Sequence, residues 1–122
     1  MKIIQDVKLD FDEVLLVPKR SGLRSRSEVE LEREFKYIPF TGIPIIVANM
    51  DHTGTMAMAE ALRPYKISVA LHKFHSSEDL LKFWITPDSQ FAWYTLGTSK
   101  DEITRFKELY HKIYPRYICV DV

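Results

Sequence analysis

The stretch that decides the fold is Ile43-Pro44-Ile45-Ile46-Val47-Ala48-Asn49-Met50-Asp51, which continues into His52-Thr53-Gly54-Thr55. A short run of β-branched residues is typical of a strand that is buried on both faces of a parallel sheet. The run ends at small and polar residues, and a helix is predicted to follow. Because α/β folds bind ligands at the carboxyl ends of their strands, residues 49–51 are predicted to lie where chemistry occurs.

Similar units of strand and helix follow this stretch. Strands are predicted to begin at intervals of 24 or 25 residues, near Ile43, Ile67, Ala92 and Arg116. Helices are predicted over 55–62, from 76 to about 87, and from 99 to just before 115. The last two begin with the spacing of a capping box, which is carried by Ser76 with Asp79 and by Ser99 with Glu102. Strands that alternate with helices in this way indicate a parallel sheet.

Residues 1–41 are organised differently. Residues 14–17 are predicted to form a short strand closed by Pro18, and residues 19–27 form a loop with four basic residues and no acidic one. Residues 28–35 alternate charged and apolar side chains, as a half-exposed strand does. We therefore divide the chain into an extended amino-terminal segment with a basic loop, residues 1–41, and the repeat of strands and helices, residues 42–122.

The length of the chain constrains the architecture. An eight-stranded barrel needs about 250 residues, and the 122 residues here hold four predicted strands and three predicted helices. Half of a barrel alone leaves its inward apolar side chains unpacked. We interpret the chain as an α/β fold, the amino-terminal half of a (β/α)8 TIM barrel preceded by an extended, hairpin-like segment. The remaining half is expected from further chain or from a partner.

Composition excludes several functional classes. Lysine plus arginine and aspartate plus glutamate both number 17, so no overall charge favours nucleic acid or a membrane surface. A signal peptide and a transmembrane span are not predicted, and a cytoplasmic protein is expected. Cys119 is the single cysteine, and we expect an inert thiol buried in the last strand. His72 and His75 lack an acidic or cysteine companion at ligand spacing, so we expect a surface or mouth-lining role for them and predict no metal site.

Several long motifs, in order along the chain, resemble the GMP reductase family. They are residues 9–21, 23–33 and 42–51, then Gly54-Thr55, His72-Lys73, Gly97-Thr98-Ser99 and Cys119-Val120-Asp121-Val122. IMP dehydrogenases are the nearest relatives of that family and share its barrel. They usually carry a domain inserted after the second barrel strand, whereas here residues 72–77 lead directly into a predicted helix. The resemblance therefore favours the reductase.

This resemblance implies a reaction, in which NADPH reduces GMP to IMP with release of ammonia. In the family a cysteine nucleophile carries the purine, and its motif lies beyond residue 122; Cys119 is not its equivalent. No catalytic residue is therefore expected in these residues, and they are expected to be inactive alone. The family also implies GMP and IMP as ligands, a homotetramer, and a monovalent cation, potassium, bound by the part that is absent here.

The resemblance carries five cofactor-binding residues and one substrate-binding residue onto this chain. Ser25 and Arg26 match a pair that reaches NADPH from a neighbouring subunit, and a guanidinium fork suits a phosphate. Lys73, Asp121 and Val122 match NADPH contacts at the ends of the second and fourth strands, and Met50 matches a wall of the purine pocket. The structural alternatives are a solvated basic loop, an exposed loop lysine and a methionine that only packs.

Two other functions stay open from the sequence. One is an IMP dehydrogenase that lacks the inserted domain, and the other is a short, non-catalytic half-barrel that binds a partner. The chain also departs from the reductase pattern, with His52-Thr53 where threonine and valine are usual, and with His72-Lys73-Phe74-His75 at the second corner. These departures bear on the geometry of the cofactor site.

Overall fold

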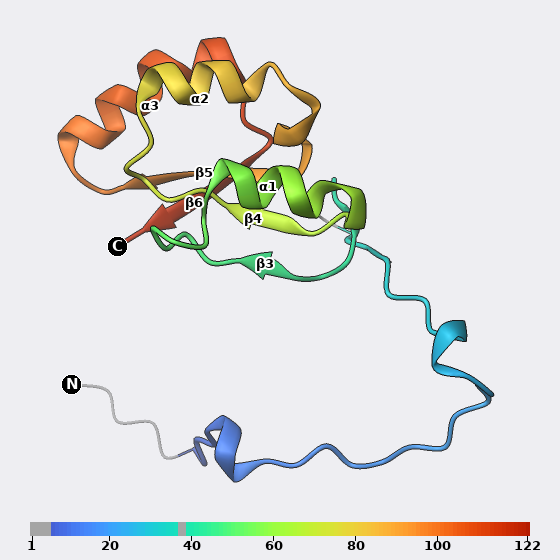
Figure 1. Cartoon of the computed structure of the whole chain (residues 1–122). Helices are drawn as coiled ribbons and strands as arrows, with labels where there is room; N and C mark the ends of the chain where they lie inside the picture. Colours follow the sequence, from blue (N-terminus) through green and yellow to red (C-terminus); the bar gives the residue numbers. More distant parts are fainter. Residues whose placement is uncertain (1–5, 37–38) are drawn as a thin grey trace. The chain divides into compact units, whose positions relative to one another are not determined.

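The computed structural model describes residues 6–36 and 39–122 (Figure 1). The chain divides into two compact units, residues 1–30 and 31–122. The division at residues 41 and 42 that the sequence suggests stays a prediction.

The first unit contains two short 3-10 helices, η1 (Phe11–Glu13) and η2 (Arg26–Glu28). Asp10 caps η1, because its carboxylate accepts a hydrogen bond from the Phe11 amide at 2.7 Å. The strand predicted over residues 14–17 is wrong, since no described residue pairs with their backbone in a strand. Leu15 and Leu16 are 95% and 97% exposed.

The second unit contains a parallel sheet of four strands in the order β3, β4, β5, β6. The strands are β3 (Ile46–Val47), β4 (Ser68–Ala70), β5 (Ala92–Gly97) and β6 (Tyr117–Asp121). The helices α1 (Met56–Leu62), α2 (Ser77–Trp84) and α3 (Lys100–Ile113) lie on one side of this sheet (Figure 1). Short 3-10 helices η3 (Arg63–Tyr65) and η4 (Pro87–Phe91) precede β4 and β5. The predicted parallel α/β fold is confirmed, whereas a closed barrel is not seen.

The helices begin where the sequence predicts, because side-chain oxygens satisfy their first amides. Thr55, Ser76 and Ser99 each accept a hydrogen bond from the backbone N–H three positions later. The capping-box serines also donate to their acidic partners, Asp79 and Glu102. Helix α3 ends at Tyr114, whose φ of 43° is left-handed. Pro115 then prevents further helix.

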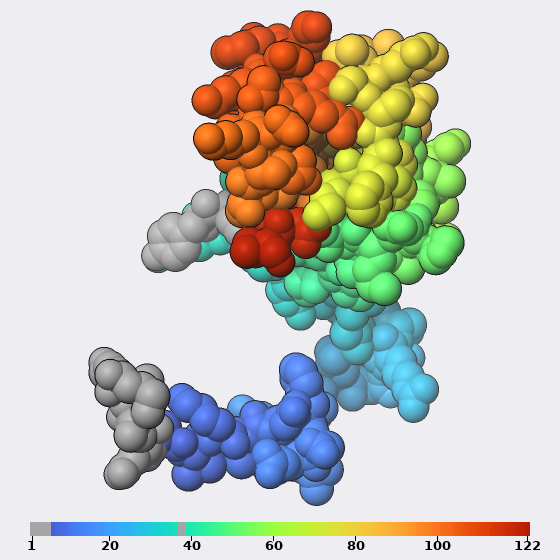
Figure 2. Space-filling model, turned by 90° about the vertical axis from the view of Figure 1, so that its left-hand side faces the viewer, coloured from blue at the N-terminus to red at the C-terminus, as the bar shows by residue number. Residues whose placement is uncertain are grey.

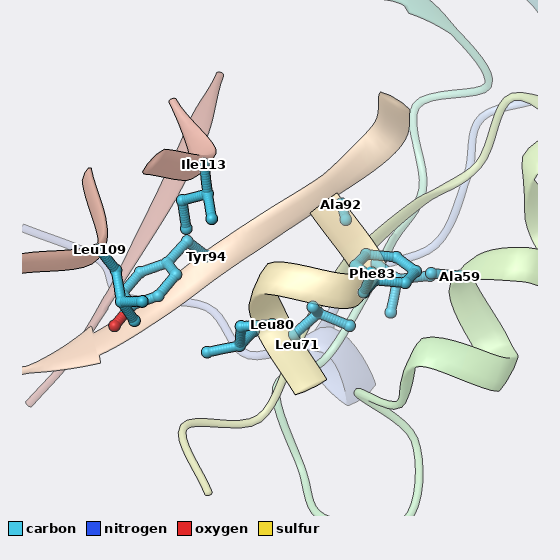
Figure 3. Close-up of a cluster of buried hydrophobic side chains, with 9 residues drawn as sticks. Ala59, Leu71, Leu80, Phe83, Ala92, Tyr94, Leu109 and Ile113 are labelled. Carbon is cyan, nitrogen blue, oxygen red and sulfur yellow. The ribbon is translucent and has the colours of Figure 1, made fainter. Parts of the chain in front are cut away.

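The hydrophobic core fills the space between the sheet and the three helices (Figure 3). Strand β4 and the residue after it contribute Val69 and Leu71, each only 1% exposed. Their neighbours come from all three helices and from β5, and they are Ala59, Leu80, Phe83, Ala92, Tyr94, Leu109 and Ile113. This packing fixes the height at which each strand ends, and so positions the loops that follow.

Two predicted strands are shorter or more exposed than expected. Strand β3 was expected to be buried on both faces, yet Ile45 and Ile46 are 53% and 55% exposed. The cause is position: β3 is an edge strand, and only Val47 packs on the core. The half-exposed strand predicted over 28–35 is reduced to β1 (Arg33–Glu34), which pairs antiparallel with β2 (Thr41–Gly42).

The hairpin of β1 and β2 covers the amino ends of the sheet strands. Phe40 is 7% exposed and packs edge-on against Tyr117, whose hydroxyl donates to the Pro39 carbonyl at 2.9 Å. Beside it lies an apolar pocket of about 190 Å³ lined by Phe35, Phe40, Pro44, Ile45, Ile46, Ser68 and Trp93. In the parts of the chain that are described, no helix has the length and apolar character needed to cross a bilayer.

Candidate functional site

The candidate site lies at the carboxyl ends of the four parallel strands. Because the strands are parallel, the loops that follow β3, β4 and β5 meet at the same edge as the end of β6. Figure 2 shows the red end of β6 at the surface beside the yellow segment that leads into α2. These loops carry Met50, Lys73 and Ser99, and the end of β6 carries Asp121.

An ion pair joins two of these corners. The Lys73 ammonium lies 3.1 Å from a carboxylate oxygen of Asp121, and both side chains are about one-third exposed. The hydrogen bond that the Lys73 ammonium donates to Asp121, and then the negative charge of that carboxylate, raise the pKa of Lys73 above its usual value of 10.5. A charged ammonium with accessible surface is suited to an anionic ligand, and the carboxylate beside it is suited to hydroxyl or amide donors.

A second carboxylate, Glu102, lies close to this pair. The Ser99 hydroxyl donates to it at 2.6 Å, and this hydrogen bond, together with the Lys73 charge, lowers the pKa of Glu102 below its usual value. Gly97 makes the arrangement possible, because a Cβ there would lie 2.4 Å from a Glu102 carboxylate oxygen. The Gly97-Thr98-Ser99 motif therefore holds the negatively charged side chain of Glu102 at the start of α3.

The first corner is a tight turn built on backbone groups. The Met50 carbonyl accepts hydrogen bonds from the amides of Thr53 and Gly54, at 3.0 and 2.7 Å. The Met50 side chain is 64% exposed, so it is free to form the wall of a ligand pocket. Gly54 is buried and touches the second corner: its carbonyl accepts from the His72 amide at 2.8 Å. The corners after β3 and β4 therefore act as one unit.

Two histidines complete this connection. The rings of His72 and His75 stack with centroids 3.7 Å apart, and His75 Nε2 lies 3.3 Å from the Gly54 carbonyl. Burial, and then the charge of His72, lowers the pKa of His75 below its usual value. The sequence predicts a surface or mouth-lining role for both histidines. In the structure both are half-buried in the loop after β4, and His75 contacts the first corner. No group of three metal-ligating side chains occurs within residues 6–36 and 39–122.

Stability is expected to fall at acid pH because of this histidine. The pKa of His75 lies below 6.5 in the folded chain, so the unfolded chain takes up a proton first as the pH falls through 6.5. The free energy of unfolding then decreases until the folded pKa is passed. His75→Gln is expected to remove this part of the acid slope, measured by urea denaturation at a series of pH values. The exposed His52→Gln is the control, and equal slopes in all three proteins would contradict the assignment.

The predicted pair Ser25 and Arg26 lies in the first unit. Ser25 caps η2, accepting a hydrogen bond from the Ser27 amide at 3.3 Å, and this leaves Arg26 at the start of the helix and exposed. Both line an open hollow of about 310 Å³ together with Ser21, Leu23, Arg24 and Val29. Two guanidinium groups beside exposed hydroxyls give this hollow the chemistry to bind a phosphate.

The structure brings together some of the predicted site residues and not others. Lys73 and Asp121 are in contact, and Val122 follows them, fully exposed. Met50 lies on a neighbouring corner of the same unit, while Ser25 and Arg26 belong to the first unit. Cys119 is half-buried instead of buried, because β6 is an edge strand.

Three residues that matter to this site were not predicted as site residues. From the sequence, Glu102 was predicted only as the partner of Ser99 in a capping box. The contact between His75 and the Gly54 carbonyl has no signal in the sequence. Arg105 on α3 donates to the loop after β4, about thirty residues away in sequence. An arginine on an amphipathic helix resembles any solvated charge until the helix packing is known.

Comparisons with known proteins identify relatives. No protein-family model matches the chain. Proteins called GMP reductase match all of it: those of Tolumonas auensis and Serratia proteamaculans are 40% identical, and that of Buchnera aphidicola is 41% identical. The chain spans 37–38% of the length of these relatives. The crystal structure of inosine 5′-monophosphate dehydrogenase from Legionella pneumophila matches 92% of this chain with a TM-score of 0.73 and 29% identity, over 34% of that protein.

Proposed function

Because the chain belongs to the IMP dehydrogenase and GMP reductase family and matches the amino-terminal 38% of GMP reductases, we propose that it forms part of an NADPH-dependent GMP reductase. The enzyme would convert GMP to IMP and ammonia in purine nucleotide salvage. The observation that carries this proposal is a match of about 40% identity along the whole chain. The ion pair of Lys73 and Asp121 at those corners supports it.

The described residues fit the chemistry of NADPH. Its phosphates are anions, and Lys73, Ser25 and Arg26 offer an ammonium, a hydroxyl and a guanidinium that are accessible. Asp121 can accept hydrogen bonds from a ribose or an amide, and Val122 offers backbone and an apolar side chain beside it. Bound NADPH supplies a hydride; the chain's own contribution is to bind and orient it.

Other parts of the proposal concern the complete enzyme. Met50 forms a wall of the purine site for GMP and IMP. The cysteine nucleophile, and the monovalent cation, lie in the region that corresponds to the rest of the relatives' length. Ser25 and Arg26 serve the cofactor of a neighbouring subunit, which requires a homotetramer or another assembly with that contact. The enzyme acts in the cytoplasm.

An assay of the native protein tests the proposal. The purified protein should oxidise NADPH, followed by the loss of its absorbance, only when GMP is present, and should release ammonia in equal amount. Absence of GMP-dependent oxidation would refute it. Intact mass spectrometry of the native product adds an independent check: a mass near 14.3 kDa with no partner chain would favour a non-catalytic binding module.

The runner-up function is IMP dehydrogenase. The Legionella pneumophila structure supports it, because the folds agree with a TM-score of 0.73. The two enzymes would share one scaffold and IMP as a ligand, but they work in opposite redox directions. Assays of IMP with NAD⁺ and of GMP with NADPH, on the same preparation, separate them: reduction of NAD⁺ that depends on IMP would favour the dehydrogenase.

Arg26→Ala is expected to weaken NADPH binding about tenfold or more and leave GMP binding unchanged. Loss of one hydrogen bond to a charged group costs about 1.5–3 kcal/mol, and 1.4 kcal/mol is a factor of about ten. Isothermal titration of the native protein with each ligand measures the effect. Arg20→Ala is the control, because Arg20 is exposed in the same unit and lies outside the hollow. Equal loss of both ligands would contradict a cofactor role.

A further inference from the structure

The loop between β4 and α2, residues 71–76, carries Lys73 to the edge of the sheet. A loop of this kind makes few regular backbone hydrogen bonds, so its shape depends on groups that bind its carbonyls. The side chain of Lys73 ends in an ammonium that pairs with Asp121 on β6. The position of the ammonium therefore depends on what holds the backbone of residue 73.

Arg105 holds that backbone from another element. It lies on α3, and its Nη1 donates to the Lys73 carbonyl at 3.3 Å, while its Nη2 donates to the His75 carbonyl. Its Nε donates to the Ser77 hydroxyl at 3.1 Å, in the first turn of α2. A guanidinium is planar and rigid, so three donors on one group fix three points of the loop relative to each other.

These contacts differ from an ordinary surface charge in two ways. The Arg105 side chain is half-buried, and none of its three partners is a carboxylate. An arginine that only balanced charge would pair with an acidic residue. Within the described part of the chain, Arg105 forms no ion pair with Asp101, Glu102 or Glu108, the acidic residues within four positions of it on α3. The guanidinium instead serves as a template for the loop.

We infer that Arg105 is a positioning residue for the cofactor end of the site, because it holds the loop that presents Lys73 to the ligand. The lysine is thereby anchored twice, by its carbonyl to Arg105 and by its ammonium to Asp121. This inference rests on the proposed function for the identity of the ligand, NADPH. Its structural part, the control of Lys73 by Arg105, stands independently of that ligand.

The test compares Arg105→Ala with Lys107→Ala in the native protein. Lys107 lies on the same helix, is exposed and carries the same charge, so its replacement controls for net charge and helix propensity. The first measurement is the rate at which an N-hydroxysuccinimide ester acylates Lys73, followed by mass spectrometry. Only a neutral amine reacts, and the partner Asp121 keeps Lys73 charged. Without Arg105 the loop should hold Lys73 less firmly against Asp121, so Arg105→Ala should speed the acylation of Lys73 severalfold. An acylation rate equal to that of Lys107→Ala would overturn the inference.

The second measurement is the affinity for each ligand. Arg105→Ala should raise the Kd for NADPH about tenfold, the cost of one charge-assisted contact, and leave the Kd for GMP unchanged. Low concentrations of guanidinium ion should restore both NADPH affinity and slow acylation. An equal loss of both ligands, with no rescue, would indicate a merely structural role and overturn the inference.

Two further arms keep the outcomes separate. If Arg105→Ala does not fold, Arg105→Lys replaces it; a lysine keeps the charge but cannot bind three points at once, so the same changes are expected at smaller size. Unchanged acylation in that variant overturns the inference. If the unsubstituted protein fails to bind NADPH, the proposed function fails, and the acylation rates still decide whether Arg105 controls Lys73.

Discussion

Gly54→Ala is expected to destabilise the second unit by about 3 kcal/mol or more, a large part of the roughly 5–15 kcal/mol that holds a domain together. A Cβ at this position would lie 2.4 Å from the Ala70 carbonyl oxygen, 2.9 Å from the His72 amide nitrogen and 3.0 Å from the Ala48 carbonyl oxygen. All three are backbone atoms of neighbouring strands or corners, and they cannot move aside as a flexible side chain can. The corner after β3 must therefore separate from the corner after β4.

Urea denaturation followed by tryptophan fluorescence measures this effect, since Trp84 and Trp93 both lie in the second unit. Gly22→Ala is the matched control, because no atom lies within 4 Å of the added Cβ. It should change the free energy of unfolding by less than about 0.5 kcal/mol. If the two variants proved equally stable, the close approach of the two corners would be contradicted.

A loss of function should accompany the loss of stability. The Gly54 carbonyl accepts from both the His72 amide and the His75 ring, so its displacement loosens the loop that carries Lys73. NADPH affinity of Gly54→Ala should therefore fall even at temperatures where the variant remains folded.

Leu71→Ala is expected to lower the free energy of unfolding by about 2–5 kcal/mol. Leu71 is 1% exposed and lies among Phe83, Leu80 and the other side chains of the core (Figure 3). Removing three carbons there leaves a cavity, and the three helices and the sheet around it cannot all move inward to fill it. Part of the loss is the transfer free energy of the leucine, and part is the unfilled volume.

The control for this variant is Leu16→Ala. The chemical change is the same, but Leu16 is 97% exposed, so its replacement should alter stability by less than about 0.5 kcal/mol. Urea unfolding curves of the three proteins give the comparison. A Leu71→Ala effect below 1 kcal/mol, at about the level of an exposed site, would mean that the core is not packed as described.

The sequence predicted the elements whose signals are local. Caps at Ser76 and Ser99 give two helix starts to within one residue, because a side-chain oxygen and an amide three positions later are enough to define them. The strands beginning at Ala92 and near Arg116 were found for the same reason, since their apolar runs are bounded by helix ends and prolines.

Features that depend on tertiary packing were not predicted. The run from Ile43 reads as fully buried, but the helices cover only one face of the sheet, and in β3 only Val47 lies on that face and packs on the core. Which face is covered is a property of the whole fold. Residues 14–17 have strand propensity, but no residue in the described part of the chain pairs with them. In the site, the pairing of Lys73 with Asp121 follows from the parallel order of the strands, whereas the reach of Arg105 depends on how α3 packs against α2.

The order of the strands has a consequence for how the chain is made. In the second unit each strand of the parallel sheet pairs with the strand that precedes it along the chain, from β3 to β6. Synthesis on the ribosome delivers about 5–20 residues per second from the amino end, so each new strand emerges beside a completed one. The nascent sheet therefore grows in one direction, and its most recent strand is always the template for the next. In a folding chain that pauses after β6, this exposed template is also the edge at which two copies would join and aggregate.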